Sequence, residues 1–349
     1  MSNSLKENAH AVLIPAFADL RLSDAVRRFL NGGGCSLILG ETREEYVARQ
    51  MTPQRRQEET AESLLAVTEK VNALSGGSLI AVDQEIAGIR RLHDLVPPFP
   101  PAVQLHEMSS VAFEIGAGQV AAAARALGIN CFLGPILDIV TGDNPWLFDR
   151  TWSTDPQIIA RMTTAYIRGV QANGVAAAAK HFPGYAQLIH DPAVEPEARL
   201  TEPLPVVESN ITIFAEAIRQ GAAMIMTGPA VVESLDPDRA VSLSPVVIQI
   251  LREKLGFKGG VLSDDLDSQA ILRGSSITRA AVDALNAGVD LLLIADMDDH
   301  IHQIVEEIIK AVQNGTLAEP RLAEAAAKVR ALVKKIQQLD GGVSYLGVV

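Results

Sequence analysis

Residues 156–183 read PQIIARMTTAYIRGVQANGVAAAAKHFP, and this stretch decides the fold. Its first part, Pro156–Asn173, carries apolar residues at helical spacing, and Asp155 supplies a capping oxygen just before the proline. Gly174 follows at the position expected for a left-handed helix cap. Val175–Lys180 is then a short apolar run ending in lysine, typical of a parallel strand covered on both faces. The stretch therefore predicts one helix followed by one buried strand.

The same unit recurs on both sides of this stretch. The expected strands are Ala11–Ala16, Ser36–Gly40, Leu79–Asp83, Cys131–Pro135, Val175–Lys180, Ala222–Thr227, Gly260–Asp264 and Asp290–Ala295. The expected helices are Ser23–Leu30, Pro53–Leu74, Ser110–Leu127, Pro156–Asn173, Val207–Gln220, Pro245–Leu255, Ile277–Asn286 and His300–Gln313. Eight alternating units predict an α/β protein, a (β/α)8 TIM barrel with a parallel sheet inside and helices outside.

The residues at the helix ends support this division. A capping side chain precedes a proline at three expected helix starts, Thr52-Pro53, Asp155-Pro156 and Ser244-Pro245. A glycine follows the expected helix at three helix ends, where a left-handed cap is expected before the next strand. These glycines are Gly174, Gly221 and Gly288.

The pattern runs on without a linker or low-complexity segment, so we expect one domain over residues 1–349. A last helical stretch, about 320–339, is expected to pack outside the barrel. The alternative is an open, doubly wound sheet. Against it, no glycine-rich phosphate fingerprint follows the first strand, because the glycines at 32–34 precede a strand instead.

Composition limits the partners of the protein. The 349 residues include 30 basic and 42 acidic side chains, a net charge of −12, with no basic cluster of the kind that binds nucleic acid. With 48% hydrophobic and 21% charged residues the chain can bury a large core. The chain shows no secretory pattern at its start and no apolar run near the roughly 18 residues of a membrane span. We expect a cytoplasmic protein without a membrane partner.

Neither the cysteines nor the histidines form a metal-binding pattern. Cys35 and Cys131 lie far apart inside apolar runs, which is typical of buried thiols in a reducing compartment. The histidines are scattered and lack ligand spacing, so we expect no metal site and no cofactor. The sequence leaves the oligomeric state open.

Polar residues gather where the expected strands end. In a barrel these carboxyl ends form the active face, so one rim would hold Asp83-Gln84-Glu85, Asp138 and Asp149-Arg150, Lys180-His181, Thr227 and Asp264-Asp265. Any one of them could be a salt bridge or a helix cap, but their recurrence on five strands favours a polar pocket. Carboxylates and cations together suit a polyhydroxylated substrate, and a sugar is the natural one.

Several motifs resemble glycoside hydrolase family 3, and among its members most closely the single-domain bacterial β-N-acetylhexosaminidases. They are Lys180-His181-Phe182-Pro183-Gly184, Leu255-Gly256-Phe257-Lys258-Gly259 and Ser263-Asp264-Asp265-Leu266. Supporting segments run along nearly the whole chain, at Asp83-Gln84-Glu85 with Arg91, Gly134–Ile139, Asp149-Arg150 and Ala287–Asp290.

This resemblance implies a TIM barrel and a retaining hydrolase that cleaves a terminal β-linked sugar, an N-acetylhexosaminide, through a covalent glycosyl-enzyme intermediate. The family's nucleophile position falls on Asp264, whose carboxylate can attack the anomeric carbon and later leave. Positions that hold sugar hydroxyls in the family fall on Asp83, Arg91, Asp138, Arg150, Lys180 and His181.

The loop after the fifth strand departs from the family. In the hexosaminidases it carries an Asp-Ser-His element whose histidine is the acid/base, whereas here Asp191 keeps the aspartate position and Ala193 replaces the histidine. His190, beside Asp191, can take the role after a shift of loop register. Alternatively, Glu195 or Glu197 acts as a carboxylic acid.

Two other departures leave the sugar specificity open. Where the family has two glycines and an arginine, this chain has Ile86-Ala87-Gly88. Where the family commonly has a histidine, it has Gly228-Pro229. The alternatives are a family 3-like glycosidase with another sugar preference, or a protein that binds sugars without turnover. A third is an aldolase that forms a Schiff base on Lys180, against which the adjacent motif argues.

Overall fold

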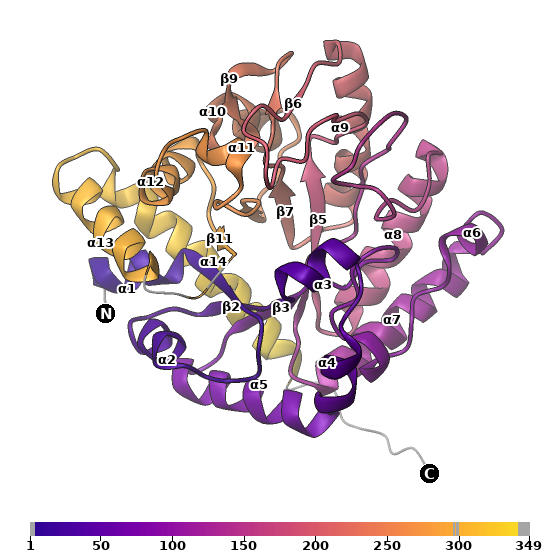
Figure 1. Cartoon of the computed structure of the whole chain (residues 1–349), viewed down its shortest axis with the longest axis horizontal. Coiled ribbons are helices and arrows are strands. Elements are labelled where there is room, and N and C mark those ends of the chain that lie inside the picture. The colour runs from indigo at the N-terminus through magenta and orange to yellow at the C-terminus, as the bar shows by residue number, and fades with distance from the viewer. Residues whose placement is uncertain (1–3, 296, 298–299, 341–349) are drawn as a thin grey trace.

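The strands form a ring of parallel neighbours, as the computed structural model shows for residues 4–295, 297 and 300–340 (Figure 1). The order around the ring is β10-β7-β5-β4-β3-β2-β1-β11. A further parallel bridge, Leu262 to Leu291, joins the two ends. The strands are β1 (Leu13–Phe17), β2 (Ser36–Leu39), β3 (Leu79–Val82), β4 (Cys131–Phe132), β5 (Ala176–Phe182), β7 (Met224–Thr227), β10 (Gly260–Leu262) and β11 (Leu292–Ile294). The (β/α)8 barrel is thus confirmed.

Helices surround the ring and follow the expected alternation. They are α2 (Asp24–Asn31), α5 (Ala61–Ser75), α7 (Ser110–Ala126), α8 (Pro156–Ala172), α9 (Leu204–Arg219), α10 (Pro245–Gln249) with a π-helical turn at Ile250–Lys254, α12 (Ile277–Ala287) and α13 (His300–Gln313). The predicted caps are confirmed, since Thr52, Asp155 and Ser244 each accept a backbone hydrogen bond. Gly174, Gly221 and Gly288 adopt φ of 75°, 77° and 110°.

The helix expected over Pro53–Leu74 is two helices. It divides into α4 (Pro53–Glu58) and α5 because Glu59 is extended, with φ −84° and ψ 118°. The side chain of Glu59 binds the buried Arg91, and Thr60 caps the new helix. A long-range ion pair therefore overrides the local helical pattern.

Several short elements lie outside the predicted alternation. They are α1 (Leu5–Ala11), α3 (Arg43–Ala48), α6 (Ala102–Leu105), α11 (Gln269–Leu272) and a small sheet of β6 (Arg199–Leu200), β8 (Val231–Val232) and β9 (Asp236–Ala240). Because Ala11 ends α1, the first strand starts at Leu13 rather than at Ala11. The capping box of Ser4 and Glu7 is the sequence signal for α1.

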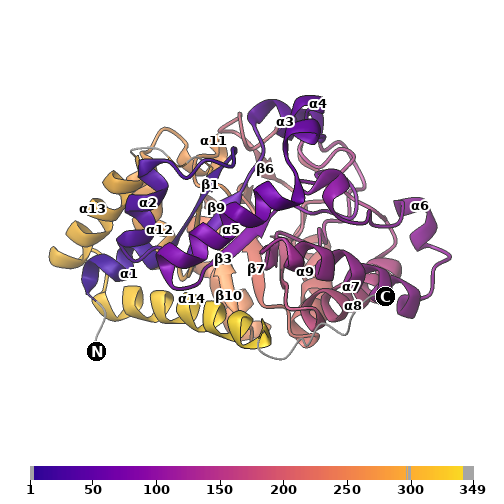
Figure 2. The same cartoon turned by 90° about the horizontal axis from the view of Figure 1, so that it is seen from below.

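The last helix, α14 (Glu319–Asp340), closes one end of the barrel. Its side chains Val329, Val333 and Ile336 join the same apolar cluster as inward-facing strand residues such as Leu79 and Met224. Figure 2 shows α14 running beneath the strands, with α3 and α4 at the opposite end. The amino-terminal mouth is therefore filled, and a site has room only at the carboxyl ends. That residues 1–349 act as one domain stays a prediction.

Asp290 connects α14 to the point where the ring of strands closes. Its buried carboxylate binds Arg321 at 2.9 Å and Lys328 at 3.5 Å, both from α14. The other oxygen pairs with Arg252 and accepts the Val261 amide of β10 at 3.1 Å. The buried carboxylate of Asp290 thus contacts three cationic side chains, two from α14 and one from the π-helical turn Ile250–Lys254.

We predict that Asp290→Ala lowers the free energy of unfolding by about 3–5 kcal/mol, because removal of a buried partner leaves charges uncompensated. Asp283→Ala is the control, since Asp283 pairs at the surface with Arg279 and should change stability by less than about 1 kcal/mol. Urea unfolding measures both. Equal, small losses would show that the Asp290 cluster does not stabilise the barrel.

Candidate active site

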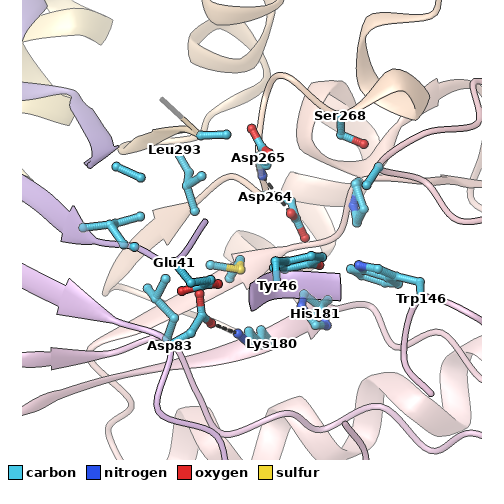
Figure 3. A pocket seen from close by; sticks show the side chains of 18 of the residues that line it. Glu41, Tyr46, Asp83, Trp146, Lys180, His181, Asp264, Asp265, Ser268 and Leu293 are labelled. Atoms are coloured by element: carbon cyan, nitrogen blue, oxygen red, sulfur yellow. Dashed lines mark hydrogen bonds and ion pairs between the residues drawn. The ribbon is translucent and has the colours of Figure 1, made fainter. Parts of the chain in front are cut away.

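A cavity of about 360 Å³ opens at the carboxyl ends of the strands (Figure 3). Side chains from loops after different strands line it, among them Glu41, Tyr46, Asp83, Trp146, Arg150, Lys180, His181, Asp264 and Asp265. Five of the predicted site residues therefore meet in one cavity: Asp83, Arg150, Lys180, His181 and Asp264.

Buried ion pairs join the loops after β3 and β4 to strand β5. The ammonium of Lys180 lies 2.5 Å from Asp83 Oδ1 and 3.0 Å from Glu85 Oε1. The guanidinium of Arg150 donates to Glu85 at 2.6 Å and to the hydroxyl of Tyr46 at 3.2 Å. These contacts fix the cations without closing the cavity.

The charged groups of this buried network shift one another's pKa values. Burial by itself lowers the pKa of Lys180, but Asp83 and Glu85 offset this and the net pKa lies above its ordinary value. Burial would raise the pKa of Glu85, and the charges of Arg150 and Lys180 lower it to about 2. Lys180 is therefore a charged group held between carboxylates.

Asp138 and Trp146 orient His181. One oxygen of Asp138 contacts His181 Nδ1 at 2.8 Å and accepts the His181 amide at 3.0 Å. The other accepts the Tyr185 amide at 2.8 Å. The ring of Trp146 lies 4.4 Å from that of His181, centroid to centroid. Asp138 is fully engaged behind the cavity wall, while His181 faces the cavity.

Asp264 stands just after β10 with one oxygen uncommitted. Its Oδ1 accepts the Asp265 amide at 2.7 Å, and its amide donates to Ser242 Oγ at 3.3 Å. Oδ2 is buried and has no hydrogen-bond partner among the described residues. Burial raises the pKa of this carboxyl, while His181 and Lys180 act in the opposite direction. A buried carboxylate oxygen beside cations is available for a ligand.

Arg91 lies outside the cavity. It is completely buried, and its guanidinium binds Glu59 at 2.7 and 2.9 Å and the Gly40 carbonyl at 2.6 Å. Its amide also donates to the Asp83 carbonyl at 2.9 Å. These bonds tie the loops after β2 and β3 together, behind the lining side chains.

The loop after β5 turns its backbone, not its titratable groups, toward the cavity. Pro192 and Ala193 line the wall, and the Pro192 carbonyl accepts Ser268 Oγ at 2.5 Å and the Ala270 amide at 3.0 Å. The remaining candidates lie outside the lining: His190, Asp191, Glu195 and Glu197.

Within this loop His190 and Glu195 form a pair. His190 Nδ1 contacts Glu195 Oε2 at 2.6 Å, and both side chains are about 40% exposed, at 39% and 42%. Asp191 caps the turn by accepting the Ala193 amide at 2.9 Å, and Glu197 is exposed. The structure thus does not bring these groups to Asp264.

Sequence reasoning missed several lining residues, among them Glu41, Tyr46 and Trp146. Glu41 stands two residues after the end of the strand Ser36–Leu39, so the rule that selected Asp83 also selects it. Tyr46 and Trp146 come from α3 and from a long loop, and no spacing signals their position.

The departure at Gly228 has a steric cause. A Cβ there would lie 2.1–2.5 Å from the ring of Tyr185, whose hydroxyl donates to the Ala230 carbonyl at 3.2 Å. Any side chain at 228 would displace this buried tyrosine, so the packing around Tyr185 requires glycine at this position.

No cluster of three or more His, Cys, Asp or Glu residues suited to a metal ion occurs within the part of the chain that the structure describes. Among the same residues, no helix combines the length and apolarity needed to cross a membrane.

Comparison with protein families and curated proteins gives consistent matches. The family model of the glycosyl hydrolase family 3 N-terminal domain matches residues 23–332. A beta-hexosaminidase of Nitrosomonas eutropha is 31% identical over 259 residues, covering 72% of this chain and 74% of that protein. A beta-hexosaminidase of Xanthomonas oryzae pv. oryzae is 31% identical over 247 residues, covering 68% and 72%.

Solved structures share the fold over nearly the whole chain. A glycoside hydrolase family 3 beta-N-acetylglucosaminidase from Paenibacillus sp. FPU-7 has a TM-score of 0.86 at 25% identity, covering 99% of this chain. This chain corresponds to 65% of that one. A beta-N-acetylhexosaminidase from Beutenbergia cavernae has a TM-score of 0.80 at 22% identity, covering 98% of this chain and all of that one.

We predict that Glu85→Gln destabilises the protein by about 3 kcal/mol at pH 7, because Lys180 and Arg150 keep their buried charges. The Glu85 pKa is about 2 in the folded protein against an ordinary 4.5, so its stabilisation is present above pH 4.5 and lost toward pH 2. Urea unfolding from pH 7 to pH 2 should show the difference from wild type shrinking.

The control is Glu233→Gln, which removes a half-exposed partner of Arg199 and should change stability by less than about 1 kcal/mol. A Glu85→Gln effect that is independent of pH would contradict an electrostatic role.

Proposed function

Because this chain belongs to glycosyl hydrolase family 3, we propose that it is a retaining glycosidase that removes a terminal β-linked sugar, an N-acetylhexosamine, from a glycoside. The names of the beta-hexosaminidase relatives support the choice of sugar. The observation that carries the proposal is Asp264, a strand-end carboxylate in a cavity of cations and carboxylates, with a buried oxygen that no described residue contacts by a hydrogen bond.

The cavity has groups for both ends of a sugar ring. Asp264 follows β10, and Asp83 follows β3, which lies on the opposite side of the ring of strands. With the anomeric carbon at Asp264, the ring hydroxyls face Asp83, Lys180 and His181, with Arg150 beside them. Asp138 and Arg91 contribute indirectly, since Asp138 orients His181 and Arg91 holds the loop of Asp83.

Hydrolysis proceeds by two displacements. The Asp264 carboxylate attacks the anomeric carbon, an ester bond forms, and the bond to the leaving oxygen breaks as that oxygen takes a proton from an acid. Water then attacks the same carbon, gives up a proton to the conjugate base, and the carboxylate leaves. Burial raises the pKa of Asp264, whereas His181 and the charges of Lys180 and Arg150 oppose this effect and favour the ionised form that the first step requires.

For the acid/base we propose the loop after β5, with His190 paired to Glu195 as the first candidate. Engagement of Nδ1 by the Glu195 carboxylate leaves Nε2 to exchange a proton with the leaving group. The loop already borders the cavity through Pro192 and Ala193, and a movement of the loop would bring the pair in. Asp191 and Glu197 on the same loop are the remaining candidates.

Schiff-base chemistry at Lys180 is disfavoured. A nucleophilic lysine must be neutral, whereas Asp83 and Glu85 raise the pKa of Lys180 above its ordinary value. A protein that binds sugar without turnover is the outcome that remains if the following test fails.

We predict that Asp264→Ala lowers kcat/KM for an activated aryl β-N-acetylglucosaminide by about 10⁴-fold or more, because the covalent step loses its nucleophile. A 5-fluoro N-acetylglucosaminide, which keeps the 2-acetamido group, should add one sugar to wild type on Asp264, as seen by mass spectrometry. The product of an ordinary substrate should keep the β configuration.

Asp283→Ala is the control and should retain full turnover. Wild-type activity in Asp264→Ala, or inversion at the anomeric carbon, would refute the retaining mechanism. Absence of turnover across a panel of activated aryl β-glycosides would refute glycosidase activity on those sugars.

We also predict that His190→Gln slows an alkyl glycoside by about 100-fold while a dinitrophenyl glycoside changes only slightly, because a good leaving group needs little acid assistance. Glu195→Gln should show the same pattern more weakly. His106→Gln, at an exposed histidine, is the control. Wild-type turnover of the alkyl glycoside after substitution of His190, Asp191, Glu195 and Glu197 together would rule out this loop.

A further inference from the structure

Glu41 is a cavity carboxyl that the proposed mechanism does not use. It follows β2, and its side chain lies beside Asp83 on the cavity wall (Figure 3). Its Oε2 is buried without a hydrogen-bond partner among the described residues. A buried polar oxygen that lacks a partner is costly unless a ligand completes it.

The cations near Glu41 are already engaged by other carboxylates. Arg91 binds Glu59, and Lys180 lies between Asp83 and Glu85. Arg43, on the adjacent rim, lies over the Tyr46 ring at 5.5 Å. Within the part of the chain that the structure describes, Glu41 therefore forms no ion pair that would balance a negative charge.

The neighbouring carboxylates favour the protonated form of Glu41. Burial and the negative charge of Asp83, with a contribution from Glu85, raise its pKa to about 8, against the opposing effects of Arg91 and Lys180. Near neutral pH, Glu41 thus carries a proton and can donate a hydrogen bond, whereas Asp83 beside it is an acceptor.

The place of Glu41 in the barrel decides which part of a sugar it meets. In the ring of strands β2 neighbours β3, and β3 lies opposite β10. With the anomeric carbon at Asp264, the far side of a pyranose ring carries the hydroxyl on C4. Glu41 and Asp83 therefore face this hydroxyl, while the leaving group lies elsewhere.

Resting on the proposed function, we propose that Glu41 is a specificity residue that donates a hydrogen bond to the C4 hydroxyl of a terminal pyranose, while Asp83 accepts a hydrogen bond from the same hydroxyl. A hydroxyl is both donor and acceptor, so the pair satisfies both of its roles. A second sugar linked to O4 would replace the hydroxyl proton that Asp83 needs and would collide with this wall of the cavity. The enzyme would therefore act only on a sugar at the end of a chain.

The test compares wild type, Glu41→Gln and Glu41→Ala on an aryl β-glycoside and its 4-deoxy analogue between pH 5 and pH 9.5. We expect wild-type kcat/KM to fall as pH rises through about 8, where Glu41 loses its proton. Glu41→Gln keeps an amide donor and should lose this decline. Glu41→Ala should lower kcat/KM about tenfold through KM, with kcat nearly unchanged.

The 4-deoxy analogue separates a contact from a structural effect. Wild type should disfavour it by about tenfold more than Glu41→Ala does, because the variant has already lost the hydrogen bond. Glu44→Gln, at the exposed glutamate of the same segment, is the matched control. Equal discrimination in wild type and Glu41→Ala, or an unchanged pH profile in Glu41→Gln, would overturn the proposal.

Calorimetric titration of the free sugar and its 4-deoxy form into Asp264→Ala, with and without Glu41→Ala, gives the same comparison without turnover. A loss of discrimination in the double variant supports the role of Glu41 even if no aryl glycoside is hydrolysed. Turnover by wild type combined with equal binding of both sugars would reject the role of Glu41 alone.

Discussion

The rest of the site depends on the buried contact of Lys180 with Asp83 and Glu85. Taking one of these charges out of water alone would cost several kcal/mol, so each is retained only with its partners. Through Glu85 the contact extends to Arg150, and it thereby fixes the carboxyl ends of β3 and β5 and the loop after β4 relative to each other. The cavity is a product of this mutual compensation, since apolar side chains at the same positions would collapse into it.

The two ends of the barrel differ in the side chains that they bury, which are mainly apolar at the end covered by α14 and largely charged at the cavity. Inside and toward α14 the strands present mainly apolar groups, such as Leu79 and Met224, and α14 packs further apolar side chains against them. At the other end, carboxyl groups outnumber the cations that balance them, and Glu41 and Asp264 each keep an oxygen without a hydrogen-bond partner in the described part of the chain. The polar end is thus prepared for a ligand rich in hydroxyls, which can supply the missing hydrogen bonds.

Local pattern was sufficient for the alternation of strands and helices, because a buried parallel strand needs a continuous apolar run and a helix end needs a cap. The same reasoning brought Asp83, Lys180 and Asp264 to one rim, since parallel strands end together. The same reasoning failed where contacts between residues far apart in the sequence determine the course of the backbone. Glu59 ends a helix because it binds Arg91, and the loop of His190 takes its course from bonds between Pro192 and α11. Neither contact leaves a mark at short range in the sequence.

The position of α14 has a consequence for how the chain acquires its structure. Arg330 of this last helix donates to Asn8 and to the Glu7 carbonyl of the first helix, and β11 pairs with β1. The closure of the ring of strands joins Leu13 to Leu292, and the contact of α14 with the first helix joins residues 322 positions apart, so both require segments from the two ends of the described chain. During synthesis, the apolar inner side of the strands that α14 covers stays exposed until α14 leaves the ribosome, so we expect this end of the barrel to be filled late.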